Sequence, residues 1–228
     1  MKRCLLFDFD YTLADSSSAV VECVNDALRK MDIDVVSADR IHKTIGLSLD
    51  ETYHELSGDT TADKVETFQQ LFIARADAIM VDKTRIFPCA PTVIRCLRAT
   101  DFLLGIVSTK FRHRIQAILE KEQMQSLFDL IIGREDVSRP KPDPMGLLQA
   151  MSALEVPARD CLFIGDSLTD ARTAKRAGVD FVAVLSGVTH EEDFRQLGAN
   201  NIIKDLRELP GLLRQHYQGT PRLDGEAW

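Results

Sequence analysis

The sequence predicts an α/β fold in which a parallel sheet carries helices on both faces, with a helical segment inserted after the first strand. Short apolar runs bounded by polar residues are typical of buried strands, and helical patterns separate them from residue 90 onward. Residues 16–85 break this alternation and show helical periodicity alone. The 228 residues, 45% hydrophobic and 28% charged, suit one large globular domain or two small ones.

The expected strands are short apolar segments with turn residues or charges at their ends. They are Cys4–Phe9, Leu103–Val107, Leu130–Ile132, Cys161–Ile164, Phe181–Leu185 and, as the weakest segment, Asn201–Ile203. Because helical patterns lie between successive strands, the chain can cross over and start each new strand in the same direction. The sheet is therefore predicted to be parallel.

Four helices are expected between these strands. They are Ala90–Ala99, Phe111–Lys121, Pro144–Leu154 and Thr169–Ala177. Pro91 fits near a helix start, where a backbone N–H has no partner within the helix. Gly178 is the expected C-cap of the last helix, because glycine adopts the left-handed conformation that ends many helices.

Residues 16–85 are expected to form a small helical bundle over the edge of the sheet. One helical face collects Val20, Val24, Ala27, Leu28 and Met31, and another collects Val65, Phe68, Phe72 and Ile79. Ser48 with Glu51 forms a capping box, which predicts a helix start, and Gly46 and Gly58 interrupt the pattern. The expected domains are an α/β core of residues 1–15 and 86–215, a helical domain of residues 16–85 and a loose tail of residues 216–228.

Composition excludes several classes of function. With 28 Lys and Arg against 35 Asp and Glu, the net charge of −7 argues against a nucleic-acid partner. No run approaches the roughly 18 apolar residues of a membrane span, and the first apolar run is too short for a signal peptide. The five cysteines are scattered and lack a C-x-x-C pair, which indicates buried thiols. We therefore expect a cytoplasmic protein without a membrane partner.

The first motif that could carry chemistry is Asp8-Phe9-Asp10-Tyr11-Thr12, at the carboxyl end of the first strand. Residues i and i+2 of a strand point the same way, so a strand that continues to Asp10 would place both carboxylates on one face. Such a pair is tolerated only with a cation or a shared proton. Taken alone, the motif favours a solvated turn that carries two acids.

Two further motifs follow the next strands. Ser108 and Thr109 offer a hydroxyl and backbone N–H groups that can hold an anion, or they can simply cap a helix. Lys141 lies between Pro140 and Pro142, which restrict where its ammonium group can go. The alternative for this segment is a rigid surface loop before a helix.

The fourth motif, Gly165-Asp166-Ser167-Leu168-Thr169-Asp170, follows the strand Cys161–Ile164. Asp166 and Asp170 can bind a cation, one directly and one through water, or they can be an N-cap and a helix-start acid. All four motifs follow the carboxyl ends of separate strands, where open α/β sheets bind ligands. Together they predict a phosphate site with a metal, in which Mg²⁺ and Lys141 neutralise the anion locally.

In this order the motifs resemble those of the haloacid dehalogenase superfamily, in its phosphatase branch with a helical cap. The resemblance covers about residues 1–210 and rests on D-F-D-Y-T, V-S-T, K-P-D-P and G-D-S-L-T-D. The segment Ile45–Leu49 resembles a cap loop of phosphoglycolate-phosphatase-like members. Two residues depart from the family pattern: Tyr11 stands where glycine is commoner, and Lys110 where asparagine is commoner. The resemblance implies a Rossmann-like sheet and a small all-helical cap domain.

The resemblance also implies a Mg²⁺-dependent phosphoric monoester hydrolase that forms an aspartyl-phosphate. Asp8 would be the nucleophile, Asp10 the general acid and base, and Lys141 a further catalytic group. The metal would bind the Asp8 carboxylate, the Asp10 backbone carbonyl and Asp166, with Asp170 acting indirectly. The phosphoryl oxygens would be held by Ser108, Thr109 and Lys141. The implied substrate is a small phosphate ester, and the protein would be a monomer or homodimer.

Other functions remain open at this stage. A phosphomutase of the β-phosphoglucomutase type would use the same aspartates, and an inorganic pyrophosphatase or nucleotidase would use the same site. A dehalogenase is disfavoured because it needs no acid at Asp10, and a noncatalytic module because every catalytic position is filled. The basic cluster Lys110, Arg112, His113 and Arg114 is expected to be a solvated face rather than a second anion site.

Overall fold

The computed structural model describes residues 4–216, and its main feature is a six-stranded sheet in the order β5-β4-β1-β6-β7-β8. Every neighbouring pair in this sheet is parallel. The strands are β1 (Cys4–Phe7), β4 (Leu103–Val107), β5 (Leu130–Ile132), β6 (Cys161–Gly165), β7 (Asp180–Val184) and β8 (Asn201–Ile203). The predicted parallel α/β sheet is therefore confirmed, with β1 between β4 and β6.

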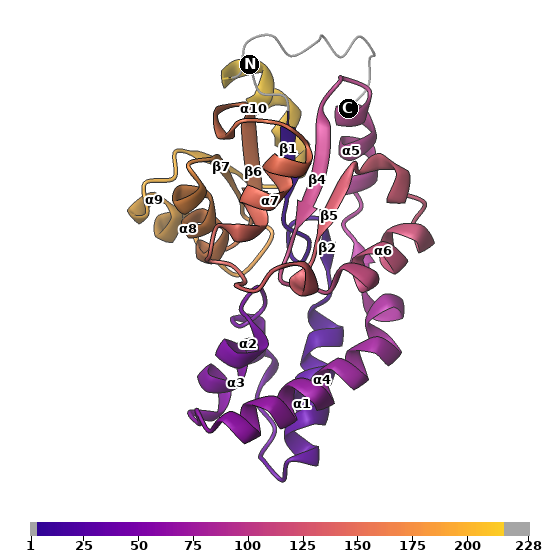
Figure 1. Cartoon of the computed structure of the whole chain (residues 1–228), viewed down its shortest axis with the longest axis vertical. Helices are drawn as coiled ribbons and strands as arrows, with labels where there is room; N and C mark the ends of the chain where they lie inside the picture. Colours follow the sequence, from indigo (N-terminus) through magenta and orange to yellow (C-terminus); the bar gives the residue numbers. More distant parts are fainter. Residues whose placement is uncertain (1–3, 217–228) are drawn as a thin grey trace.

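Helices bury both faces of this sheet (Figure 1). Alternate side chains of β1 enter different cores, since Leu5 and Phe7 pack on one face and Cys4 and Leu6 on the other. The first face is covered by α5 (Ala90–Arg98), α6 (Arg112–Lys121) and α10 (Leu209–His216). The second is covered by α7 (Met145–Ala153) and α8 (Leu168–Ala177), with α9 (Glu191–Gln196) beside α8. Short 3-10 turns lie at Gln125–Leu127, Arg134–Asp136, Ala158–Asp160 and Leu206–Glu208.

For the predicted strands and for the four predicted helices, which are α5, α6, α7 and α8, the observed boundaries agree to within a residue, except at the first strand. The helices α9 and α10 were not predicted. β1 ends at Phe7 instead of Phe9. The Asp8 amide still donates to the Ile164 carbonyl oxygen at 2.9 Å, but the chain then turns, with Tyr11 at a φ of 59°. Because the strand does not continue to Asp10, the condition under which both carboxylates would lie on one strand face is not met.

The inserted segment forms four helices, α1 (Ser17–Lys30), α2 (Ala38–His42), α3 (Leu49–Ser57) and α4 (Ala62–Lys83). They enclose their own apolar core, to which the predicted helical faces contribute Val24, Leu28, Phe68 and Phe72 as buried side chains. The predicted capping box at Ser48 is present, with Ser48 Oγ accepting from the Glu51 amide and Glu51 accepting from the Ser48 amide. Gly58 ends α3 at a φ of 72°.

A two-stranded ribbon connects the helical segment to the sheet. The chain leaves through β2 (Ala14–Asp15) and returns through β3 (Arg85–Ile86), which pair in antiparallel orientation. Each strand has two residues, too few for a periodic pattern, so the sequence analysis missed the ribbon. Figure 1 shows α1–α4 gathered at one end of the molecule, where β1 leads into β2.

None of the helices within residues 4–216 is long and apolar enough to cross a membrane. The expected tail begins at residue 216, and its residues 217–228 lie outside the described part of the chain. The fold therefore places the carboxyl ends of the central strands beside the helical segment, and the predicted motifs follow those ends.

Candidate active site

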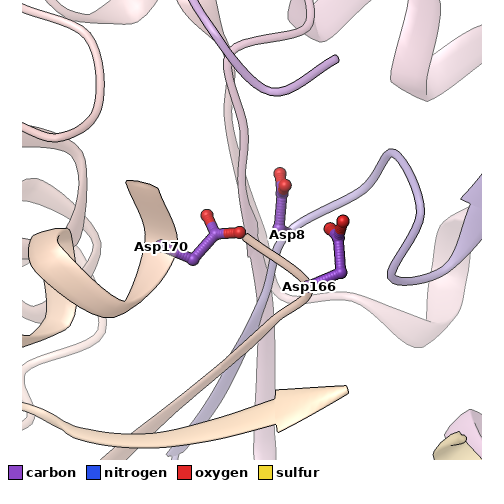
Figure 2. Close-up of side chains that lie close together, drawn as sticks. All are labelled: Asp8, Asp166 and Asp170. Carbon is purple, nitrogen blue, oxygen red and sulfur yellow. The ribbon is translucent and has the colours of Figure 1, made fainter. Parts of the chain in front are cut away.

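Three buried aspartates meet at the carboxyl ends of β1 and β6. Asp8 follows β1, Asp166 follows β6 and Asp170 lies in the first turn of α8 (Figure 2). One carboxylate oxygen from each lies within 4.8 Å of those from the other two. The structure therefore brings together three of the predicted site residues from two distant parts of the sequence.

Two glycines leave room for these carboxylates. A Cβ atom at Gly187 would lie 2.0 Å from Asp166 Oδ2, and a Cβ atom at Gly165 would lie 2.6 Å from the Asp170 side chain. Thr12 Oγ1 donates to Asp166 Oδ1 at 3.2 Å, which orients that carboxylate from the other side. Sequence analysis did not identify Thr12 or Gly187 as site residues, and Gly187 lies in no motif that could have indicated its role.

Asp170 is held by the helix start that contains it. Ser167 is the N-cap of α8, so the alternative in which Asp166 caps the helix was wrong. Ser167 Oγ accepts from the Asp170 amide at 3.1 Å and donates to Asp170 Oδ2 at 2.5 Å. The S-x-x-D spacing of this capping box was a signal in the sequence that could have identified Ser167.

Lys141 bridges two of the three aspartates. Its Nζ atom lies 2.9 Å from Asp8 Oδ1 and 2.6 Å from Asp170 Oδ1, and the side chain is 4% exposed. The Lys141–Pro142 peptide bond is cis. Burial alone would lower the pKa of Lys141, but the charges of Asp170 and Asp8 outweigh it and hold the pKa above its ordinary value. The ammonium group is therefore charged.

Three carboxylates share one ammonium group, that of Lys141, so the cluster has more acidic than basic groups. Burial raises the pKa of Asp8 to about 6, against the attraction of Lys141 and with the repulsion of Asp170. Burial, followed by the charges of Asp170 and Asp8, raises the pKa of Asp166 well above its ordinary value. Asp8 Oδ1 accepts no well-aligned hydrogen bond from the described residues, although Lys141 Nζ is close. An all-oxygen site with excess negative charge fits a hard divalent cation such as Mg²⁺.

Asp10 is outside this cluster and has its own partners. Lys110 Nζ lies 3.0 Å from Asp10 Oδ1 and 3.1 Å from Asp10 Oδ2, and Ser16 Oγ donates to Oδ1 at 2.6 Å. Sequence analysis identified neither Lys110 nor Ser16 as a site residue, because nothing in the local pattern shows which loops meet in space.

The prediction of a solvated face was wrong for two of the four residues of the basic cluster. Lys110 and Arg114 are buried, whereas Arg112 and His113 are exposed. Arg114 Nε donates to Asp77 Oδ1 at 2.8 Å and its Nη2 to the Ile73 carbonyl oxygen at 3.2 Å. Because Arg114 belongs to α6 and its partners to α4, this side chain ties the helical segment to the sheet.

Ser108 and Thr109 lie in the loop after β4. Ser108 Oγ accepts from the Lys110 amide at 3.3 Å, and a hydrogen bond from Ser108 also acts to lower the pKa of Asp8. Thr109 Oγ1 donates to the Gly46 carbonyl oxygen at 3.4 Å. The N-cap of α6 is Phe111, so the simple capping alternative for Ser108 and Thr109 was wrong.

A cavity of about 300 Å³ lies between the sheet and the helical segment. Asp10, Thr109 and Lys110 line it from the core, and Ile45, Leu47 and Phe72 are among the residues that line it from the helices. Gly46, at a φ of 95°, turns the loop between α2 and α3 towards Ser167 and Thr109. The cavity is large enough for a small organic molecule, and among the predicted site residues it is lined by Asp10 and Thr109 but not by Asp8, Lys141 or Asp166.

Comparisons with known proteins agree with this architecture. The model of the haloacid dehalogenase-like hydrolase family matches residues 5–184. A phosphoglycolate phosphatase from Colwellia psychrerythraea is 32% identical over 215 residues, which cover 91% of this chain and 95% of that protein. The pyrophosphatase PpaX of Listeria monocytogenes is 28% identical over 212 residues, with coverages of 92% and 95%.

Solved structures share this fold, and one of them carries the same family name. A haloacid dehalogenase-like hydrolase from Bacteroides fragilis superposes with a TM-score of 0.89 at 41% identity, over 92% of this chain and all of that one. A hydrolase from Pseudomonas syringae superposes with a TM-score of 0.82 at 26% identity, over 94% of this chain and 99% of that chain. The family resemblance of the four motifs is confirmed, and the chain belongs to the haloacid dehalogenase-like hydrolases.

Proposed function

We propose that this protein is a Mg²⁺-dependent phosphatase that hydrolyses small phosphate monoesters through an aspartyl-phosphate on Asp8. The observation that carries the proposal is the position of Asp8, which lies beside Lys141 and between two further carboxylates. Its Oδ1 atom accepts no well-aligned hydrogen bond from the described residues, and it belongs to a cluster in which three carboxylates share the single ammonium group of Lys141. Relatives named phosphoglycolate phosphatase and pyrophosphatase support phosphoryl chemistry at such a site.

In the first step a carboxylate oxygen of Asp8 attacks phosphorus, and the bond between phosphorus and the ester oxygen breaks. Asp10 gives a proton to the leaving oxygen, so the product leaves as an alcohol. Lys141, Ser108 and the Thr109 amide hold the phosphoryl oxygens while negative charge spreads over them. Asp170 fixes Lys141 through the contact between its Oδ1 atom and Nζ.

In the second step water breaks the aspartyl-phosphate. Asp10 takes a proton from the water molecule, whose oxygen bonds to phosphorus while the bond to the Asp8 oxygen breaks. Inorganic phosphate leaves and Asp8 is regenerated as a carboxylate. The Asp8 and Asp166 carboxylates and the Asp10 backbone carbonyl would hold Mg²⁺. When bound, the metal would offset the negative charge of the phosphoryl oxygens, so that the Asp8 carboxylate could approach the anionic phosphate ester.

Residues 16–85 act as the cap of this site, and residues 1–15 with 86–215 as its catalytic core. The cavity between them, of about 300 Å³, has the size of a small ester. Closure of the cap removes bulk water, which strengthens the contacts of Lys141 with the phosphoryl group. The loop around Gly46 and the walls of the cavity therefore contact the leaving group and select which esters bind.

A screen of phosphate compounds with Mg²⁺ tests the proposal. The set contains two-carbon, sugar and nucleoside phosphates, pyrophosphate and a matched sugar bisphosphate. Asp8→Asn should lose all turnover, because an amide is a poor nucleophile, while Asp26→Asn, at a half-buried position of α1 that pairs with Lys30, should keep wild-type rates. More than about 1% residual activity in Asp8→Asn would contradict the nucleophile assignment. Turnover only with an added bisphosphate would instead indicate a phosphomutase.

A further inference from the structure

An ion pair outside the carboxylate cluster of Asp8, Asp166 and Asp170 lies at the wall of the cavity. Lys110 Nζ contacts both carboxylate oxygens of Asp10, and the two side chains are 4% and 13% exposed. Both residues line the cavity between core and cap. An ammonium group in contact with both oxygens of a carboxylate restricts the rotation of that carboxylate.

Lys110 is itself fixed from several directions. Its amide donates to Ser108 Oγ at 3.3 Å, and its carbonyl oxygen accepts from the Arg134 amide at 3.0 Å. Its Nζ atom lies 5.9 Å from the centroid of the Phe9 ring, which favours a cation over the ring face. The ammonium group is therefore an anchored partner for Asp10 and differs from a mobile surface lysine.

Burial of this pair has no evident value for stability. Moving two charges from water into the protein costs free energy, and their mutual attraction recovers only about that amount. A buried ion pair is therefore weak evidence that the folded state is stabilised. Lys141 already balances the charge of Asp8 and Asp170 on the other side of the site. Lys110 instead holds the Asp10 carboxylate at the cavity wall, apart from the cluster of Asp8, Asp166 and Asp170.

We propose that Lys110 is a positioning residue that holds Asp10 in the orientation from which it protonates the leaving oxygen. This inference rests on the proposed function, in which Asp10 is the general acid. Lys110 then acts on the bond between phosphorus and the leaving oxygen through Asp10, without touching the phosphoryl group. The loss of activity when Lys110 is replaced should therefore depend on how strongly the leaving oxygen needs a proton.

The experiment compares esters with different leaving groups. An alkyl phosphate needs a proton on its leaving oxygen, whereas p-nitrophenyl phosphate releases a stable anion and needs little help. The measured quantity is kcat/KM, which reports the steps up to formation of the aspartyl-phosphate. The variants are Lys110→Met, Lys110→Arg and Asp10→Asn, with Lys30→Met as the control because Lys30 pairs with Asp26 on the surface of α1.

Lys110→Met should lower kcat/KM for the alkyl ester by about 100-fold and for p-nitrophenyl phosphate by less than about five-fold. Lys110→Arg should recover most of the alkyl-ester activity, because a guanidinium group also binds both oxygens of a carboxylate. Asp10→Asn should show the same selective loss, and Lys30→Met should change neither ester.

Equal losses on both esters in Lys110→Met would overturn the inference, because a structural or phosphate-binding role does not distinguish leaving groups. If Lys110→Met does not fold, Lys110→Gln takes its place in the same comparison, with Lys110→Arg as the variant expected to retain activity. A selective loss in Asp10→Asn without one in the Lys110 variants would reject the inference alone. No selective loss in Asp10→Asn would reject the general acid role in the proposed function, and the inference with it.

Discussion

Asp8 and Asp10 are two residues apart in the chain, yet each carboxylate contacts a different buried lysine. Lys141 Nζ lies 2.9 Å from Asp8 Oδ1, and Lys110 Nζ lies 3.0 Å from Asp10 Oδ1. The turn that begins after β1, with Tyr11 at a φ of 59°, separates the two side chains. One carboxylate therefore joins the acidic cluster while the other borders the cavity, which gives two similar residues different chemical surroundings.

The first prediction separates these two aspartates by metal binding. Asp166→Asn should weaken Mg²⁺ binding by at least about ten-fold, because it removes a charged oxygen ligand. Asp10→Asn should leave Mg²⁺ affinity within about three-fold of wild type, since only its backbone carbonyl would bind the metal. Isothermal titration calorimetry on both variants measures this. A collapse of affinity in Asp10→Asn would mean that its side chain is a ligand.

The second prediction concerns stability and pH in the absence of metal. The folded-state pKa of Asp8 is about 6, above the ordinary 3.8, and that of Asp166 is also raised. The folded protein therefore holds more protons than the unfolded chain above about pH 4, so these groups make it less stable as pH rises through their folded-state pKa values.

Because Mg²⁺ competes with those protons, the increase in Tm on adding Mg²⁺ should be larger at about pH 7.5 than at about pH 5. Thermal unfolding in both buffers, with and without Mg²⁺, provides the measurement. Asp166→Asn should lose most of this pH-dependent difference. An equal or larger metal effect at the lower pH would contradict the assignment of these carboxylates as the metal site.

The third prediction tests the space around Asp166. Gly187→Ala places a Cβ atom 2.0 Å from Asp166 Oδ2, so the carboxylate or the loop must move. Both Mg²⁺ affinity and activity should fall by at least about ten-fold, because the supporting groups of a metal site affect it nearly as strongly as the ligands. Gly211→Ala is the matched control, since nothing lies within 4 Å of its added Cβ atom. Wild-type activity in Gly187→Ala would show that the loop adapts.

Much of the fold could be predicted because its elements produce periodic patterns. Both faces of β1 are buried, so Cys4, Leu5, Leu6 and Phe7 form a continuous apolar run. The strand end could not be placed, because the turn after it depends on Tyr11 adopting a conformation unusual for tyrosine. The ribbon of β2 and β3 was missed because pairs of residues carry no periodicity.

The site residues divide in the same way, into those that a local sequence motif indicates and those whose role depends on contacts between distant segments. Asp8, Asp166, Asp170 and Lys141 occupy motifs that follow strands, and a parallel sheet brings those ends together. Lys110 was assigned to a solvated face because four basic residues lie close together in the sequence. Its buried ammonium group contacts Asp10 and lies near the ring of Phe9, both from a distant part of the chain, and no pattern within residues 110–114 encodes that.

The last prediction concerns the cap and the size of the substrate. Arg114 on α6 donates to Asp77 Oδ1 and to the Ile73 carbonyl oxygen on α4, so it holds the cap against the core. With the cap in place, a small ester should be hydrolysed with a kcat/KM at least about 100-fold above that of a phosphopeptide. Arg114→Met removes both contacts, and the more mobile cap should raise KM for the small ester by several-fold and narrow this ratio.

Arg207→Met, which breaks a local surface pair with Asp205, should leave the ratio unchanged. The ratio is measured by phosphate release from both substrates at the same Mg²⁺ concentration. Equal efficiency on both substrates in the wild-type protein would mean that the cap does not restrict access to Asp8.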